Sequence, residues 1–188
     1  MKKLVLIFTL LFVVGYAFAQ EIDETLDKKT QKKYEKQEKK KQKEEEAEKA
    51  KEELNEMIDN RSFVLEANNL SGRSGAQVPV VPSLNFFAID SSTAVLQIGS
   101  VSGIGYNGVG GVTDEARVTR YEKTETKGGY SVKIYATSHL TSYTIFLSAS
   151  PLGTSTARVT GLSGGVINFH GKIVPISESI VYKGITSY

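Results

Sequence analysis

The sequence predicts an all-β fold: an antiparallel meander of about eight strands that closes into a barrel, preceded by a charged N-terminal helix. Three observations lead to this prediction. Of the 17 glycines in the 188 residues, 16 lie in residues 61–188. Apolar and polar residues alternate there at a period of two, which is typical of half-buried strands. Short turn-rich links separate these segments, and no helical pattern lies between them.

Residues 1–19 have the pattern of a secretory signal peptide. Two lysines follow the first methionine, an apolar run extends from Leu4 to Val14, and Ala17-Phe18-Ala19 places small residues where signal peptidase reads them. We expect cleavage before Gln20 and a periplasmic, cell-envelope or secreted location. The alternative is an N-terminal membrane anchor, but the apolar run is shorter than the about 20 residues that a span needs.

Residues 20–60 are expected to form a charged helical linker or arm. They carry 11 Lys and 14 Asp/Glu, and good helix formers dominate. No residue from Glu35 to Glu46 is apolar, so a helix here has no face to bury. Helical apolar spacing returns at Leu54, Met57 and Ile58, and we expect this end to pack on the following domain.

Three roles are open for this arm. A solvated linker is favoured over a coiled coil or a partner-binding arm, because apolar a and d positions are not sustained. A helix lying on a membrane surface is not expected, because lysines alternate with glutamates and no apolar face opposes them. Whether the arm is one continuous helix is left open by the sequence.

The domain at residues 61–188 is expected to contain its strands in a fixed order. Their ranges are Arg61–Asn68, Leu84–Asp90, Thr93–Gly99, Glu115–Thr124, Tyr130–Thr137, Ser142–Ser148, Thr154–Thr160 and Val166–Val174. A short extra strand is expected at Glu178–Tyr182. A barrel is favoured over a β-sandwich, which shares the same signature, because closing a simple meander removes its edge strands.

Two glycine-rich strings resemble motifs of catalysis or cofactor binding. Gly103–Gly108 spells G-x-G-x-x-G, but a dinucleotide site needs a helix to follow, and none is expected there. Gly161–Gly165 spells G-x-S-x-G around Ser163, but a nucleophile elbow also needs a helix, whereas a strand follows. Both strings are therefore interpreted as loops or turns between strands.

Other catalytic and cofactor chemistries have little support in the sequence. The chain has no cysteine, and its two histidines, His139 and His170, lie far apart. The region 61–188 holds seven carboxylates, whose spacing does not indicate a catalytic pair. Without its first 19 residues the chain balances 21 cations against 21 acids, so no nucleic-acid footprint is expected. We expect no enzyme, no cofactor and no metal.

Aromatic residues give the candidate binding residues. Tyrosines that point into a barrel can line a pocket with polar tips, although core packing accounts for most single aromatics. We name four candidates for a small apolar ligand in a barrel mouth: Tyr106, Tyr121, Tyr135 and Phe169.

The order of features resembles a family of exported Gram-negative bacterial proteins, domain-of-unknown-function family 4251. The resemblance spans about residues 60–175, and it rests on segments that include Phe63–Ala67, the Lys127–Tyr130 hairpin, Tyr143–Leu147 and Ile167–Ile173. It implies a lipocalin-type antiparallel barrel and assigns no activity or catalytic residue. Around the glycine-rich loop the family often has more aromatic residues, where this chain has only Tyr106.

Three classes of function follow from these observations. The first is an exported non-catalytic binding module, with an apolar ligand in the barrel mouth. The second is a structural or adaptor protein of the cell envelope with a solid barrel. The third, least supported, is a hydrolase that uses paired carboxylates or Ser163.

Overall fold

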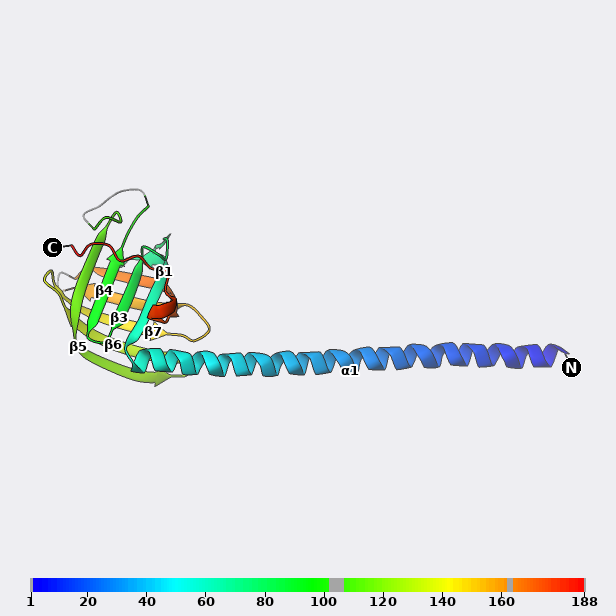
Figure 1. Cartoon of the computed structure of the whole chain (residues 1–188). Coiled ribbons are helices and arrows are strands. Elements are labelled where there is room, and N and C mark those ends of the chain that lie inside the picture. The colour runs from blue at the N-terminus through cyan, green and yellow to red at the C-terminus, as the bar shows by residue number, and fades with distance from the viewer. Residues whose placement is uncertain (1, 102–106, 162–163, 188) are drawn as a thin grey trace. The chain divides into compact units, whose positions relative to one another are not determined.

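A computed structural model of the chain describes residues 2–101, 107–161 and 164–187, with side chains described from residue 30 onward. The chain divides into two compact units, Met1–Glu46 and Ala47–Tyr188. Helix α1 (Lys2–Asp59) contributes to both units, and all strands belong to the second (Figure 1). Among the described residues, none of the helices combines the length and apolar character of a membrane span.

The second unit is a closed antiparallel barrel of eight strands with one extra strand (Figure 1). Neighbouring strands pair in chain order, and β1 pairs with β9 to close the barrel. The barrel strands are β1 (Ser62–Ser71), β3 (Phe86–Asp90), β4 (Thr93–Ile98), β5 (Val112–Thr126), β6 (Gly129–Thr137), β7 (Ser142–Ala149), β8 (Ser155–Gly161) and β9 (Val166–Val174). Strand β2 (Gln77–Pro79) pairs with the end of β1, and a 3₁₀ turn, η1 (Ile176–Glu178), follows β9. The predicted barrel is confirmed.

The eight predicted strands correspond to these barrel strands, and the bounds of β9 agree with the prediction. The strand predicted at Glu178–Tyr182 is wrong. The Ser179 hydroxyl and the Ile180 amide donate to Glu66 Oε1, at 2.8 Å and 2.9 Å, so this backbone binds a side chain and not a sheet edge. Strand β2 was not predicted, because three exposed residues carry no alternation to detect.

The barrel interior is filled by the alternating inward side chains of its strands. Phe63 and Phe87 meet edge to face, with ring centroids 6.3 Å apart. The fully buried inward side chains include Phe63, Leu65, Phe87, Ile89, Ile134, Ile145, Leu147 and Phe169. Along β1 and β6 alternate residues are buried, as the predicted period of two requires.

The end of α1 packs against this core, as predicted. Leu54 and Ile58 are buried within the same apolar cluster as the barrel side chains, and Met57 packs against its edge. A bulge after Val118 shifts the alternation of β5 by one residue. Beyond the bulge, Tyr121 therefore faces inward and meets the helix end.

The C-terminal segment crosses the outside of the barrel over β1, β3, β4 and β5 (Figure 1). We call residues 179–187 the C-terminal strap. Beneath it, the buried Gln97 amide donates to the Tyr182 carbonyl at 2.8 Å and accepts from the Gly184 amide at 2.8 Å. The Ser187 amide donates to the Thr113 carbonyl at 2.8 Å. The strap is thus held both by outward-facing side chains of the barrel wall and by backbone carbonyls of the wall and its loops.

Candidate functional site

The structure separates the aromatic residues that were named as ligand contacts. Phe169 is buried in the apolar core and Tyr121 faces inward under the helix end, whereas Tyr135 lies on the outer wall. Tyr106 lies outside the described residues. These placements bring no two of the described candidates together around one opening, so their role in ligand binding stays a prediction.

Two of these aromatics have evident partners in the structure. The Tyr121 hydroxyl donates to the Ile58 carbonyl at 2.9 Å, and the Arg61 guanidinium lies 4.7 Å from the ring centroid. Burial raises the pKa of Tyr121 well above its usual value, an effect that nearby Arg61 opposes. On the outer wall, Lys133 lies 5.0 Å from the Tyr135 ring centroid. Both tyrosines therefore have structural roles in this fold.

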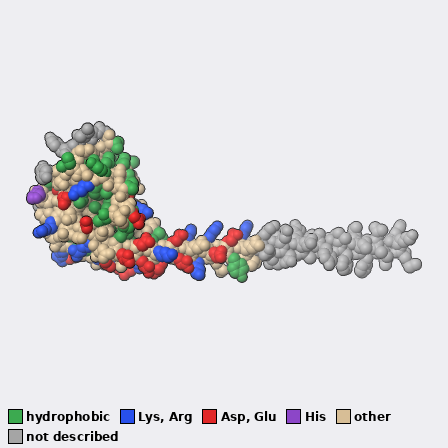
Figure 2. Space-filling view, viewed as in Figure 1, with side chains coloured by type: hydrophobic (Ala, Val, Ile, Leu, Met, Phe, Trp, Pro, Cys, Tyr) green, Lys and Arg blue, Asp and Glu red, His purple; other side chains and the backbone are tan. Residues whose placement is uncertain are grey.

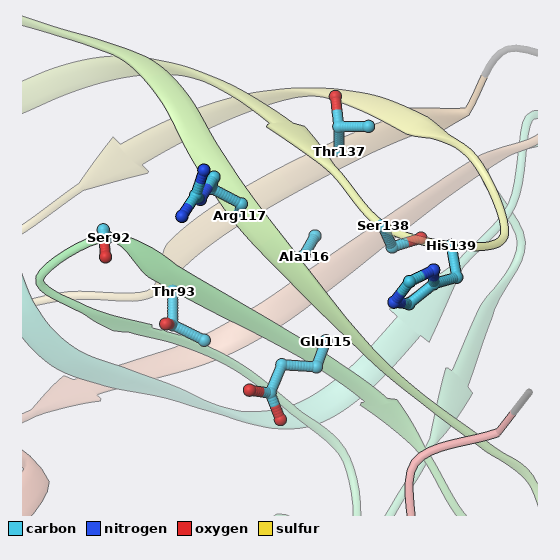
Figure 3. Close-up of a pocket in the computed structure, with 8 residues that line it drawn as sticks. All are labelled: Ser92, Thr93, Glu115, Ala116, Arg117, Thr137, Ser138 and His139. Atoms are coloured by element: carbon cyan, nitrogen blue, oxygen red, sulfur yellow. The ribbon is translucent and has the colours of Figure 1, made fainter.

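A pocket of 390 Å³ lies on the outer wall where β4, β5 and β6 run side by side (Figure 3). Arg117 is central to it, because this residue pairs with Thr93 of β4 on one side and with Thr137 of β6 on the other. The lining residues are Ser92, Thr93, Glu115, Ala116, Arg117, Thr137, Ser138 and His139. The volume falls in the usual range for small-molecule sites.

The two charged side chains of β5 in this pocket differ, because only the acidic one has an ion-pair partner in the described part of the chain. Glu115 Oε2 forms an ion pair with Lys183 Nζ of the C-terminal strap at 2.5 Å. The lysine neutralises the carboxylate. Within the described ranges, no hydrogen bond or ion pair holds the Arg117 guanidinium or the His139 imidazole. Figure 3 shows Arg117 and Glu115 projecting from β5, with His139 at the turn after β6. The pocket thus presents one uncompensated cation among hydroxyl groups.

A buried carboxylate beside the pocket fixes the turn that carries His139. Asp114 Oδ2 accepts hydrogen bonds from the Ser138 hydroxyl at 2.7 Å and from the Tyr143 hydroxyl at 2.5 Å. Ser138 in turn accepts from the Leu140 amide at 3.0 Å. Burial, followed by the hydrogen bond to Asp114, raises the pKa of Tyr143 well above its usual value. Hydrogen bonds therefore fix the turn at this side of the pocket, whereas none holds the Arg117 guanidinium among the described residues.

The second histidine belongs to the barrel wall. His170 on β9 has Ser71 Oγ 2.9 Å from its Nε2 and Thr156 Oγ1 3.1 Å from its Nδ1. Asn168 donates to the Ser71 hydroxyl at 3.1 Å. This network joins β1, β9 and β8 on the outer face, so both ring nitrogens of His170 have partners.

Five carboxylates on the barrel each contact a different partner, and no two of them share one. The partners are Ser179 for Glu66, Tyr143 for Asp114, Lys183 for Glu115, Arg120 for Glu122 and Lys51 for Glu125. Across the described residues, no three His, Asp or Glu side chains gather as ligands of a metal ion. Ser163 lies outside the described residues.

Sequence reasoning did not find the Arg117 pocket. Its residues come from three strands and two turns, and the register between strands brings them together. One signal was available: Arg117 alternates with Ala116 and Val118 in a strand whose apolar residues face inward. That pattern predicts that the guanidinium lies on the outer wall, but it does not predict which residues surround it.

Comparisons with known proteins bear on the family and the fold. The family model of the domain of unknown function DUF4251 matches residues 41–173. The crystal structure of a DUF4251 family protein from Bacteroides eggerthii DSM 20697 is similar to this chain, with a TM-score of 0.57 and 23% sequence identity. The match covers 69% of this chain and 90% of the other. A search of curated proteins gives no match.

The matched residues run from the second half of the arm through the whole barrel to β9. The sequence match covers well over half of the chain, and the similar crystal structure shows the fold. The predicted membership of domain-of-unknown-function family 4251 is confirmed, and the chain belongs to the DUF4251 family.

Proposed function

We propose that this protein is an exported, non-catalytic binding module that holds a small anionic group in the pocket around Arg117. The observation that carries the proposal is the unpartnered guanidinium of Arg117 among the hydroxyls of Ser92, Thr93 and Thr137. A guanidinium presents a planar fork of donors that matches a carboxylate or a phosphate. Neighbouring hydroxyls supply further donors to the same anion.

The export part of the proposal rests on the signal pattern of residues 1–19. The binding part favours the outer wall over the interior, because aromatic and aliphatic side chains occupy the interior and α1 packs against the core. Glu115 does not oppose an anion in the pocket, since Lys183 neutralises it. The proposed ligand is therefore polar and anionic, and not the apolar ligand expected from the sequence.

A titration followed by amide chemical shifts tests this proposal. Inorganic phosphate and glucuronate are added separately to the exported protein, and neutral glucose serves as the ligand control. We expect both anions to shift the amides of residues 92–93, 115–117 and 137–139. Arg117→Gln should abolish these shifts, whereas Arg158→Gln, which changes an exposed arginine on β8, should leave them. Equal shifts in the two variants, or none with either anion, would overturn the proposal.

Two alternatives give different results. A lipocalin-like carrier with an apolar ligand in the barrel predicts a reproducible extra mass of a few hundred daltons, by order of magnitude, in native mass spectrometry without detergent. An adaptor with a solid barrel predicts a partner that is pulled down by the exported protein and lost when residues 20–53 are deleted. Neither result depends on Arg117, so each is distinguishable from anion binding in the pocket.

A further inference from the structure

The lysines of the arm are not spread evenly around α1. Between Thr30 and Lys43 the arm is helical, and its residues there are exposed. An α-helix turns by about 100° per residue, so residues spaced by one, three or four positions share a face. At this spacing six lysines fall within an arc about 120° wide: Lys32, Lys33, Lys36, Lys39, Lys40 and Lys43.

No other residue type of Thr30–Lys43 falls within this arc. Glu35 and Glu38 lie outside it, as do Gln31 and Gln37. The alternation of lysines and glutamates along the chain therefore becomes a separation around the helix between Thr30 and Lys43. We call the six residues the lysine face. It extends for about 16 Å along the helix axis.

The lysine face is largely uncompensated. Its one ion pair within the described residues joins Lys40 to Glu44 at 3.5 Å, and both side chains are highly exposed. Lys41, which lies off the face, pairs with Glu45 at 3.8 Å. Like charges on one helix face repel, so this arrangement costs stability unless an anionic partner is present. Figure 2 shows lysine side chains along the arm projecting into solvent.

The chemistry of the face selects among anionic partners. Every cation in residues 20–60 is a lysine, although arginine is the usual choice where phosphate groups of nucleic acid are bound as bidentate partners. Lysines act as point charges and suit a diffuse layer of negative charge. The opposite side of the helix carries Gln31, Glu38, Lys41 and Gln42, with Tyr34 as its one aromatic residue, so the helix has no continuous apolar face to insert between lipid chains.

We infer that the lysine face docks the protein on the anionic headgroups of a membrane surface, without insertion. Basic segments near such a surface gain about 1 kcal/mol for each lysine. The six lysines lie on one side of a straight helix, over about 16 Å, so all of them can contact a flat membrane surface at the same time. The arm would then tether the barrel to the membrane. This inference concerns α1 alone and does not depend on the Arg117 pocket.

The test uses the exported, processed protein and sedimentation with vesicles of two compositions. Pure phosphatidylcholine is compared with a mixture of phosphatidylcholine and phosphatidylglycerol. We expect binding to the anionic vesicles only, and loss of binding as NaCl rises from about 50 mM to about 500 mM, because salt screens exposed charges. Lys32→Gln/Lys36→Gln/Lys43→Gln should weaken binding by at least about tenfold.

A matched variant separates the face from the net charge. Exchanging each of these lysines with its neighbouring glutamine (Gln31→Lys/Lys32→Gln, Lys36→Gln/Gln37→Lys, Gln42→Lys/Lys43→Gln) keeps the composition and scatters the lysines. We expect it to bind anionic vesicles at least about fivefold more weakly than the wild type. Equal binding of wild type and permuted chain would overturn the inference.

Two other outcomes would also overturn it. A short DNA duplex that binds as tightly as the anionic vesicles would mark the face as a general polyanion site. A dimer in sedimentation velocity that the permuted variant abolishes would mark it as a contact with the acidic half of another arm. Thermal unfolding of each variant should match that of the wild type, because the substituted residues lie outside the barrel unit.

Discussion

The Tyr121 hydroxyl donates a hydrogen bond to the backbone carbonyl of Ile58, at 2.9 Å, and this bond joins β5 to the last turn of α1. The same carbonyl also accepts a hydrogen bond from the Arg61 amide at 3.3 Å, in the turn that ends the helix. Lys123, two residues further along β5, contacts Asp59 at 2.6 Å and Asn55 at 2.5 Å. The end of α1 is therefore an integral part of the barrel unit.

Removing the Ile58 side chain should destabilise the barrel. Ile58→Ala leaves a cavity within the apolar cluster, where such substitutions typically cost about 2–5 kcal/mol. Urea unfolding followed by circular dichroism gives the free energy of unfolding. Tyr34→Ala changes an exposed aromatic on the same helix and should leave that value within about 0.5 kcal/mol. Equal values for the two variants would show that the helix end is dispensable.

Gly171 should tolerate no side chain where the barrel closes. A Cβ at this position on β9 would overlap the Glu66 carbonyl oxygen and crowd the Ala67 Cα of β1. Gly171→Ala is expected to destabilise the protein by about 1–3 kcal/mol or more, because two backbones must separate. Gly72→Ala is the control, since a Cβ there meets nothing within 4 Å. Chemical denaturation of both variants measures the difference.

Alkaline pH should destabilise the protein, partly through its half-buried tyrosines Tyr121 and Tyr143. The pKa of both Tyr121 and Tyr143 is raised in the folded state, chiefly by burial, so the fold holds these phenol protons more tightly than the unfolded chain does. Their contribution to stability is complete below the ordinary tyrosine pKa of about 10, and is lost as pH rises above it.

The Tyr143→Phe variant isolates one of these contributions. It should lose stability at neutral pH, because Asp114 loses a hydrogen bond, and its stability should fall less steeply above about pH 10. The free energy of unfolding at several alkaline pH values measures the slope. An unchanged slope would mean that Tyr143 ionises normally in the folded protein.

The C-terminal strap should loosen when Gln97 loses its amide. Gln97→Leu leaves the Tyr182 carbonyl and the Gly184 amide without their partners. We expect faster hydrogen exchange and proteolysis within residues 179–187, while the core strands stay protected. Gln77→Leu, on the exposed β2, is the matched control and should leave the strap protected. Similar exchange in the two variants would contradict this role of Gln97.

The barrel could be predicted because its strands carry their own signal. The alternation of Tyr130, Val132, Ile134 and Ala136 is visible in the sequence, and the structure buries those side chains. The strap could not be predicted, because its partners Glu66 and Gln97 are more than 80 residues away. Glu178–Tyr182 has enough β-branched and aromatic character to suggest a strand. Its amides instead bind the 3₁₀ turn, the Glu66 side chain and the Ser83 carbonyl, so they do not form a ladder with a neighbouring strand.

The Arg117 pocket could not be predicted from the sequence for a related reason. Thr93, Arg117 and Thr137 meet because of strand register, and register depends on the bulge after Val118 and on the closure of the barrel. The aromatic candidates were chosen by residue type, which does not reveal which wall of the barrel a side chain faces. The lysine face, in contrast, was present in the sequence and needed only a helical projection to become visible.

The seam between β1 and β9 determines when this protein can fold. It joins Val64 to Val174 and Ser71 to Asn168. The pairing of β1 therefore cannot be completed before β9 has been synthesised. Contacts between such distant residues form slowly, because a long loop must close before they contribute. A nascent chain that lacks β9 keeps two open sheet edges and has no complete barrel. The barrel therefore cannot close until almost all of the polypeptide has been made.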